Sequence, residues 1–250
     1  MSDIATPGRV FVVRHPSDRT FFLVMLLVIW AAMLGGFGYD MARRAAAGTL
    51  HYPWIIHAHA LAYGGWLALF TAQILLIRRG DYRTHQRMGV VALILLPLMA
   101  VLGPAAAITM FRQQANDPHL DTAFFITQFT NVLGVVTLSI AGLLKRRDAA
   151  AHKRLMLLGM IAILEPGFSR IWAEQLWHLF GDGFWQYLAI TYPGSIAMVL
   201  AVGVYDYATR RRLHPAYVAG ALWIFALELC AAWLYYQPWW ASFSRSLLVG

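Results

Sequence analysis

Residues 20–38 read TFFLVMLLVIWAAMLGGFG, and none of them is charged. A helix needs roughly 20 mostly apolar residues to cross the hydrocarbon core of a bilayer. Six further apolar runs follow, at about 51–77, 86–111, 121–144, 153–173, 184–206 and 215–237. None of the runs alternates apolar and polar residues with a period of two, which is the pattern of a barrel strand. We therefore expect an all-α, polytopic membrane protein, a bundle of seven transmembrane helices.

The composition indicates the same class. Of 250 residues, 60% are hydrophobic and 13% are charged, whereas about a quarter of the residues of a soluble domain are charged. No low-complexity linker divides residues 1–250, so we expect a single transmembrane domain. The polar residues before the first run are followed by no cleavage site, and we expect no signal peptide. The single cysteine, Cys230, excludes a disulfide or a Cys-based metal site within one chain.

Basic residues predict the orientation of the bundle. Of the 20 Lys and Arg residues, 15 lie before the first run or in the second, fourth and sixth connections. The positive-inside rule places these segments in the cytoplasm, with the N-terminus inside and the C-terminus outside. We expect the membrane to be a bacterial inner (plasma) membrane. The net charge of +8 then reflects topology, and without a soluble basic face we expect no nucleic-acid partner.

Four ionisable residues are predicted to form an outer layer within the membrane. They are His57, His59, Glu165 and Glu228. Glu165 lies 13 residues after His152, which is about 20 Å along a helix that starts at the cytoplasmic side. Two histidines and two glutamates at one depth could ligate iron, copper or zinc. His57 and His59 point in different directions on an ideal helix, which favours His59.

The alternative for the outer layer is structural. The histidines and glutamates could hydrogen-bond between helices, with Arg170 neutralising Glu165. Pro166 follows Glu165 directly, so we expect the fifth run to break where it carries this charge. Further prolines interrupt the apolar runs at Pro97, Pro104 and Pro193.

A second layer is predicted at the cytoplasmic end, where histidines follow basic residues at the start of apolar runs. His85 and His152 each begin a helix face that carries glycine. Glycine allows a flat cofactor to approach closely, and two facing histidines can ligate a haem iron. Interfacial anchoring is one alternative. Another is that an anionic headgroup or substrate is bound by His85, Arg87, Lys153, Arg154, Arg212 and His214.

Several short motifs carry a resemblance to a known family. They are His59-Ala60, Leu69-Phe70-Thr71-Ala72-Gln73, Arg78-Arg79, His85-Gln86-Arg87-Met88-Gly89 and His152-Lys153-Arg154-Leu155-Met156. Over roughly residues 55–165 the chain resembles cytochrome b561-type membrane domains, and also an uncharacterised bacterial multi-pass family with a His…Gln…Arg…His-x-x-Gly pattern. The resemblance implies haem b bound through histidine pairs of the bundle.

Carried over, the resemblance assigns His85 and His152 as the inner haem ligands and His59 as an outer one. Residues 121–144, where the partner of His59 should lie, contain no histidine, and His119 is the nearest substitute. The expected function is a redox protein that transfers electrons at or across the membrane, with a quinone or another small redox partner. The alternatives are a metal-dependent membrane enzyme at the outer layer, and a non-enzymatic carrier or lipid- or protein-binding subunit. The oligomeric state stays open.

Overall fold

The computed structural model describes residues 11–117 and 120–248, which are helical throughout their regular parts. The elements are α1 (Asp18–Ala46), α2 (Trp54–Arg79), α3 (Tyr82–Gly89), α4 (Ala92–Gln113), the 3-10 helix η1 (Thr122–Phe124), α5 (Phe125–Leu144), α6 (Ala149–Ile161), α7 (Glu165–Phe180), α8 (Phe184–Thr191), α9 (Pro193–Arg210), α10 (Pro215–Tyr235) and α11 (Pro238–Leu248). No strand occurs within these described ranges. The all-α class is confirmed.

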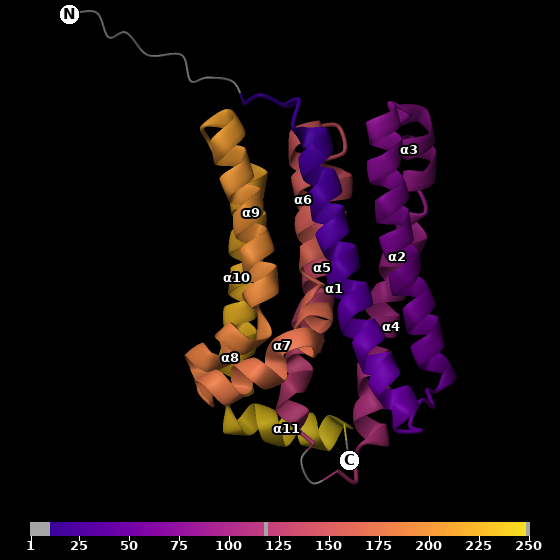
Figure 1. Cartoon of the computed structure of the whole chain (residues 1–250), viewed down its shortest axis with the longest axis vertical. Coiled ribbons are helices and arrows are strands. Elements are labelled where there is room, and N and C mark those ends of the chain that lie inside the picture. Colours follow the sequence, from indigo (N-terminus) through magenta and orange to yellow (C-terminus); the bar gives the residue numbers. More distant parts are fainter. Residues whose placement is uncertain (1–10, 118–119, 249–250) are drawn as a thin grey trace, which may run out of the picture.

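The long helices run side by side along the long axis of the molecule, whereas α7, α8 and α11 lie at one end of it (Figure 1). Five segments are long and apolar enough to cross a membrane by themselves: α1, α2, α4, α10 and the continuous segment Thr122–Leu144. Two bent pairs, α6–α7 and α8–α9, raise this number to seven if each pair is one span. The chain is thus an integral membrane protein by length and composition of its helices.

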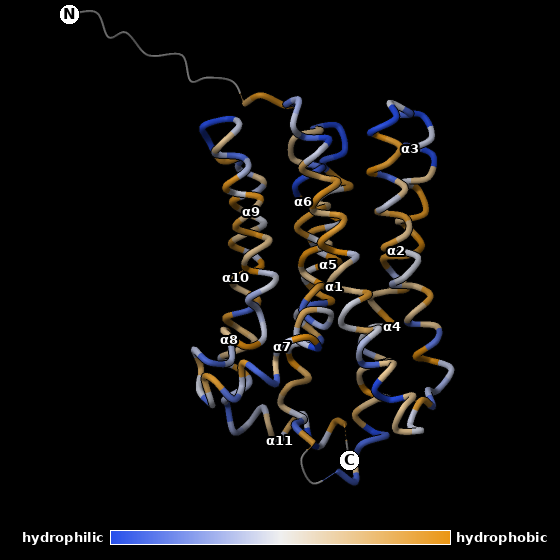
Figure 2. Tube along the Cα trace, in the orientation of Figure 1, coloured by the Kyte–Doolittle hydropathy of each residue, from blue (hydrophilic) through white to orange (hydrophobic). Residues whose placement is uncertain are grey.

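Polar sequence gathers at the two ends of the bundle, and apolar sequence fills its length (Figure 2). The start of α1 and the α2–α3, α5–α6 and α9–α10 connections, where the basic residues cluster, all lie at one end (Figure 1). We call this the basic end. Three helices begin there with a side-chain cap: Asp81 accepts from the Thr84 amide, Asp148 from the Ala150 amide and His214 from the Ala216 amide. Such caps satisfy amides that have no partner within the helix.

The core lies around α6, which packs against α5, α9 and α10. Leu157, Leu158, Met160 and Ile161 of α6 are fully buried. Large apolar side chains elsewhere point outward, as at Leu27, Leu34, Leu61, Leu93 and Leu222. An exposed apolar surface of this extent is what a bilayer covers.

Two of the expected helices are broken. The run 153–173 is divided between α6 and α7, which meet at 43° at residues 162–164, so the break expected beside Glu165 is confirmed. The run 184–206, expected as one helix, is instead divided into α8 and α9, which meet at 71° at Tyr192. The run 86–111 begins with the polar helix α3 and continues as α4 after residues 90–91.

Candidate functional site

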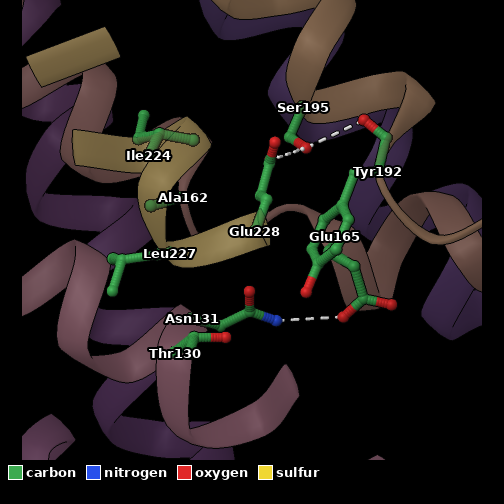
Figure 3. Close-up of a pocket in the computed structure, with 9 residues that line it drawn as sticks. All are labelled: Thr130, Asn131, Ala162, Glu165, Tyr192, Ser195, Ile224, Leu227 and Glu228. Atoms are coloured by element: carbon green, nitrogen blue, oxygen red, sulfur yellow. Dashed lines mark hydrogen bonds between the residues drawn. The ribbon is translucent and has the colours of Figure 1, made fainter. Parts of the chain in front are cut away.

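The two helix breaks meet at one small cavity inside the bundle (Figure 3). The cavity is lined by Thr130 and Asn131 of α5, Ala162 and Glu165 at the first break, Tyr192 and Ser195 at the second, and Ile224, Leu227 and Glu228 of α10. It has room for about one water molecule. Four helical segments therefore bring oxygen and nitrogen atoms to a single enclosed point.

Each break carries the same dipeptide, Pro-Gly, at Pro166-Gly167 and at Pro193-Gly194. Proline has no amide proton to continue the preceding helix, and it is well accepted in the first turn of a new one. Gly194 lies against the ring of Phe168, because a Cβ at this position would be only 2.3 Å from Phe168 Cδ2. The first turns of α7 and α9 are thus in direct contact beside the cavity.

Both carboxyl groups in the cavity accept hydrogen bonds from neutral side chains. Asn131 Nδ2 donates to Glu165 Oε2 at 3.0 Å, and Ser195 Oγ donates to Glu228 Oε1 at 2.8 Å (Figure 3). Glu165 is the first residue of α7, and Ser195 lies in the first turn of α9. The partial positive charge of a helix N-terminus therefore lies close to each carboxyl group and stabilises negative charge there.

Neither carboxyl group forms an ion pair with another described residue. Glu165 is 2% exposed and Glu228 is 6% exposed. Arg170, which we considered as a partner of Glu165, lies 4.0 Å from Asp40 and donates to the Pro166 carbonyl oxygen, and its charge acts on Glu165 without a direct ion pair. An ionised carboxylate buried without a partner is very costly. Each glutamate is therefore stable here when it carries a proton or when a small cation accompanies it.

Tyr192 adds an unsatisfied hydroxyl group to the same cavity. Its side chain is 1% exposed, and its hydroxyl oxygen has no hydrogen-bond partner among the described residues. Figure 3 shows the ring extending from the α8–α9 break towards Asn131 and Glu165. Thr127 and Tyr187 lie close to this hydroxyl group, and a water molecule in the cavity would complete its hydrogen bonding.

The predicted outer histidines lie away from this cavity. His57 is exposed, whereas His59 stacks on Tyr63 with ring centres 4.2 Å apart and has a buried Nδ1 without a partner. Within the described ranges, no group of three or more His, Cys, Asp or Glu residues could hold a metal ion. The structure thus brings together Glu165 and Glu228 but does not assemble them with the two histidines into a metal site. His119, the expected substitute ligand, lies outside the described residues.

The predicted inner histidines do lie together. The ring centres of His85 and His152 are 6.2 Å apart and the ring planes are nearly perpendicular. His152 Nδ1 donates to the Gly142 carbonyl oxygen at 2.8 Å, which leaves Nε2 as the acceptor of the neutral ring. The Gln73 amide group lies against His85 Nδ1, and with its nitrogen and oxygen exchanged its nitrogen donates to the His85 carbonyl oxygen at 3.1 Å. Burial, and secondarily the charge of His152, lowers the pKa of His85, which favours the neutral form of the His85 ring.

Of the cations predicted to bind an anion, two form ion pairs within the protein and two are exposed. Lys153 binds Asp18 at 2.7 Å, and Arg154 forms a bidentate ion pair with Asp206. These two charges are already balanced within the protein. Arg87 and Arg212 are exposed.

His214, the last member of that predicted set, has a structural role as the cap of α10 and contacts Phe11 with ring centres 4.7 Å apart. Burial, with a smaller contribution from Arg154, lowers its pKa. Anion binding by this set stays a prediction.

Sequence reasoning missed Asn131, Tyr192 and Ser195. Single residues of these types are common in apolar helices and carry no signal alone. The Pro-Gly dipeptide inside two apolar runs was the available signal, because it marks two helix breaks. The backbone groups that a break leaves without partners must be hydrogen-bonded by neighbouring side chains or water.

No protein-family model matches the chain, and no curated protein or solved structure matches it significantly. The cytochrome b561 resemblance and the haem b ligands that it implies therefore stay predictions.

Proposed function

We propose that this chain is a non-enzymatic membrane carrier that moves protons through the site between its two broken helices. The observation that carries the proposal is the convergence of both breaks on a cavity with two buried carboxyl groups, neither of which forms an ion pair with a described residue. Intramembrane carboxyl groups of this kind are the usual proton carriers of pumps and transporters.

The broken helices supply the movement that a carrier needs. Secondary transporters place their site where helices are discontinuous, and parts of the bundle then rock around it. Here α7 and α8 are short segments joined to α6 and α9 by breaks of 43° and 71°. A change of angle at either break moves Glu165 or Ser195 relative to α5 and α10. Each carboxyl group would then exchange its proton with a different side of the membrane.

The proposal counts each bent pair as one span, which gives seven crossings. The basic end then faces the cytoplasm, as the positive-inside rule requires, and the Gly181 turn between α7 and α8 faces the outside. The cavity lies beyond α6, whose 13 residues extend about 20 Å from the basic end. The cavity is therefore closer to the outer surface. We propose a plasma membrane as the location of the protein, as in the sequence analysis.

The test is proton flux in vesicles that contain the purified protein. A potassium diffusion potential drives protons inward, and a trapped pH-sensitive dye reports their entry. Glu165→Gln and Glu228→Gln keep the shape and hydrogen-bonding capacity of the side chain but cannot carry a proton. We expect each substitution to reduce the protein-dependent flux at least tenfold.

The matched control is Glu174→Gln, which alters an exposed glutamate on the same helix as Glu165. It should leave the flux unchanged. Wild-type vesicles that take up protons no faster than protein-free vesicles would contradict the proposal, and so would full flux in Glu165→Gln.

A further inference from the structure

The inner pair of histidines has methionines beside it. His85 is followed one helical turn later by Met88, and His152 is followed one turn later by Met156. Residues three and four apart on a helix share a face. Each of the two helix starts thus presents one imidazole and one thioether to its surroundings.

Contacts around Gly142 place two of these groups together. His152 Nδ1 is 2.8 Å from the Gly142 carbonyl oxygen, and Met156 Sδ is 2.8 Å from the position that a Cβ on Gly142 would occupy. The His85 ring lies next to the His152 ring, with ring centres 6.2 Å apart. Met88 is half-buried and packs against the core. A ring pair and a thioether therefore gather at the basic end of α5 and α6.

We propose that His85, His152 and Met156 form a binding site for Cu(I), with Met88 as a further ligand. A metal–nitrogen bond of about 2.0 Å places the ion about 3 Å from the centre of an imidazole ring. Two imidazoles that share one ion from opposite sides then have ring centres about 6 Å apart, which agrees with the observed separation. The site is independent of the carboxyl groups used for proton transfer.

The ligand chemistry selects the ion. Thioethers are soft ligands that favour Cu(I), and imidazole also binds copper. None of the four proposed ligands is a carboxylate. A site made of neutral ligands favours a monovalent cation over a divalent one such as Zn²⁺. A haem would need a porphyrin between the same two rings, whereas a single copper ion needs only the space between two nitrogen atoms.

Neighbouring groups orient the ligands. The Gly142 carbonyl oxygen holds the Nδ1 proton of His152, so Nε2 is directed to the ion, as backbone carbonyls do for histidines in metal sites. The Gln73 amide group contacts Nδ1 of His85, which is the same ring atom that the Gly142 carbonyl oxygen contacts in His152. When copper binds, the amide turns so that its oxygen accepts the Nδ1 proton and Nε2 of His85 becomes free to ligate.

The test is an anaerobic titration of the purified full-length protein with Cu(I), in competition with a coloured Cu(I) chelator. We expect one equivalent to bind, and X-ray absorption of the loaded protein should show both nitrogen and sulfur ligands. Met156→Leu keeps the volume of the side chain, and His152→Asn keeps an N–H near the Gly142 carbonyl oxygen. Each should weaken the binding at least tenfold.

Met160→Leu is the matched control, since Met160 is a fully buried residue of the same helix, and it should bind Cu(I) like the wild type. Glu165→Gln should also bind copper normally, so a failed proton-flux experiment and a failed copper experiment remain distinguishable. Binding below a tenth of an equivalent, or wild-type affinity in Met156→Leu, would overturn the copper site. A sharp reduced haem b spectrum lost in His152→Asn would overturn it in favour of haem.

Discussion

The ion pair between Arg154 of α6 and Asp206 of α9 is nearly inaccessible to solvent, since the two side chains are 2% and 1% exposed. Asp206→Leu leaves the Arg154 guanidinium with a hydrogen bond to the Ala150 carbonyl oxygen at 2.8 Å and with no carboxylate. Removal of one partner from a buried pair costs about 3–5 kcal/mol. Arg210, whose Nη1 lies 3.7 Å from Asp206 Oδ1, would lose a favourable contact as well. We therefore expect Asp206→Leu to destabilise the fold by about 4 kcal/mol.

The assay is reversible unfolding in mixed detergent micelles, followed by circular dichroism. Arg154→Met should cost a similar free energy, but the double variant should recover most of it, because replacing both charges by apolar groups removes the desolvation penalty. Arg43→Met is the control; this side chain is 63% exposed in its pair with Asp40, and its loss should cost less than about 1 kcal/mol. Additive losses in the double variant, or a loss below about 1 kcal/mol in Asp206→Leu, would refute the reasoning.

Three further predictions concern packing, pH and topology. Gly36→Ala should destabilise the protein by at least about 2 kcal/mol in the same unfolding assay, because its Cβ would lie 1.9 Å from the Gly167 carbonyl oxygen. Gly35→Ala is the control and should be tolerated, because its Cβ would lie 3.5 Å from Ile171 Cδ1. The pKa of His214 is lowered from 6.5 by burial, so the unfolded chain binds more protons between that lowered value and about 6.5. The free energy of unfolding should therefore be highest above about pH 6.5 and fall as the pH drops through this window. His214→Asn still caps α10 and should flatten the pH dependence of the unfolding midpoint. An unchanged pH dependence in this variant would refute the role of His214. Single cysteines at Arg147 and Asp182, in a Cys230→Ser background, should react with impermeant thiol reagents from opposite sides of the membrane, and labelling from the same side would contradict the seven crossings.

The parts of the fold that follow from local sequence were predictable. Long apolar runs dictate helices in a bilayer, and basic residues at alternate connections predict that these connections share one end, as the structure shows. The break beside Glu165 was predictable from Pro166. The break at Tyr192 does not follow from Pro193 alone, because a proline inside an apolar run is compatible with a continuous, kinked helix. The Pro-Gly dipeptide that it shares with the first break was the available signal.

The candidate site was only half predictable. Glu165 and Glu228 stood out because carboxyl groups are rare within apolar runs. Their partners depend on how helices rotate against each other, which the sequence does not specify. Asn131 meets Glu165 because α5 packs on α6, and His59 turns to Tyr63 instead of towards the carboxyl groups.

The measurement that tests the central claim most directly is voltage-driven proton uptake by vesicles containing wild-type protein, compared with vesicles containing the double variant Glu165→Gln, Glu228→Gln at the same protein density. The account predicts uptake that rises with the amount of wild-type protein and falls to the level of protein-free vesicles in the double variant. Equal uptake by the two proteins, or wild-type uptake at the protein-free level, would contradict it.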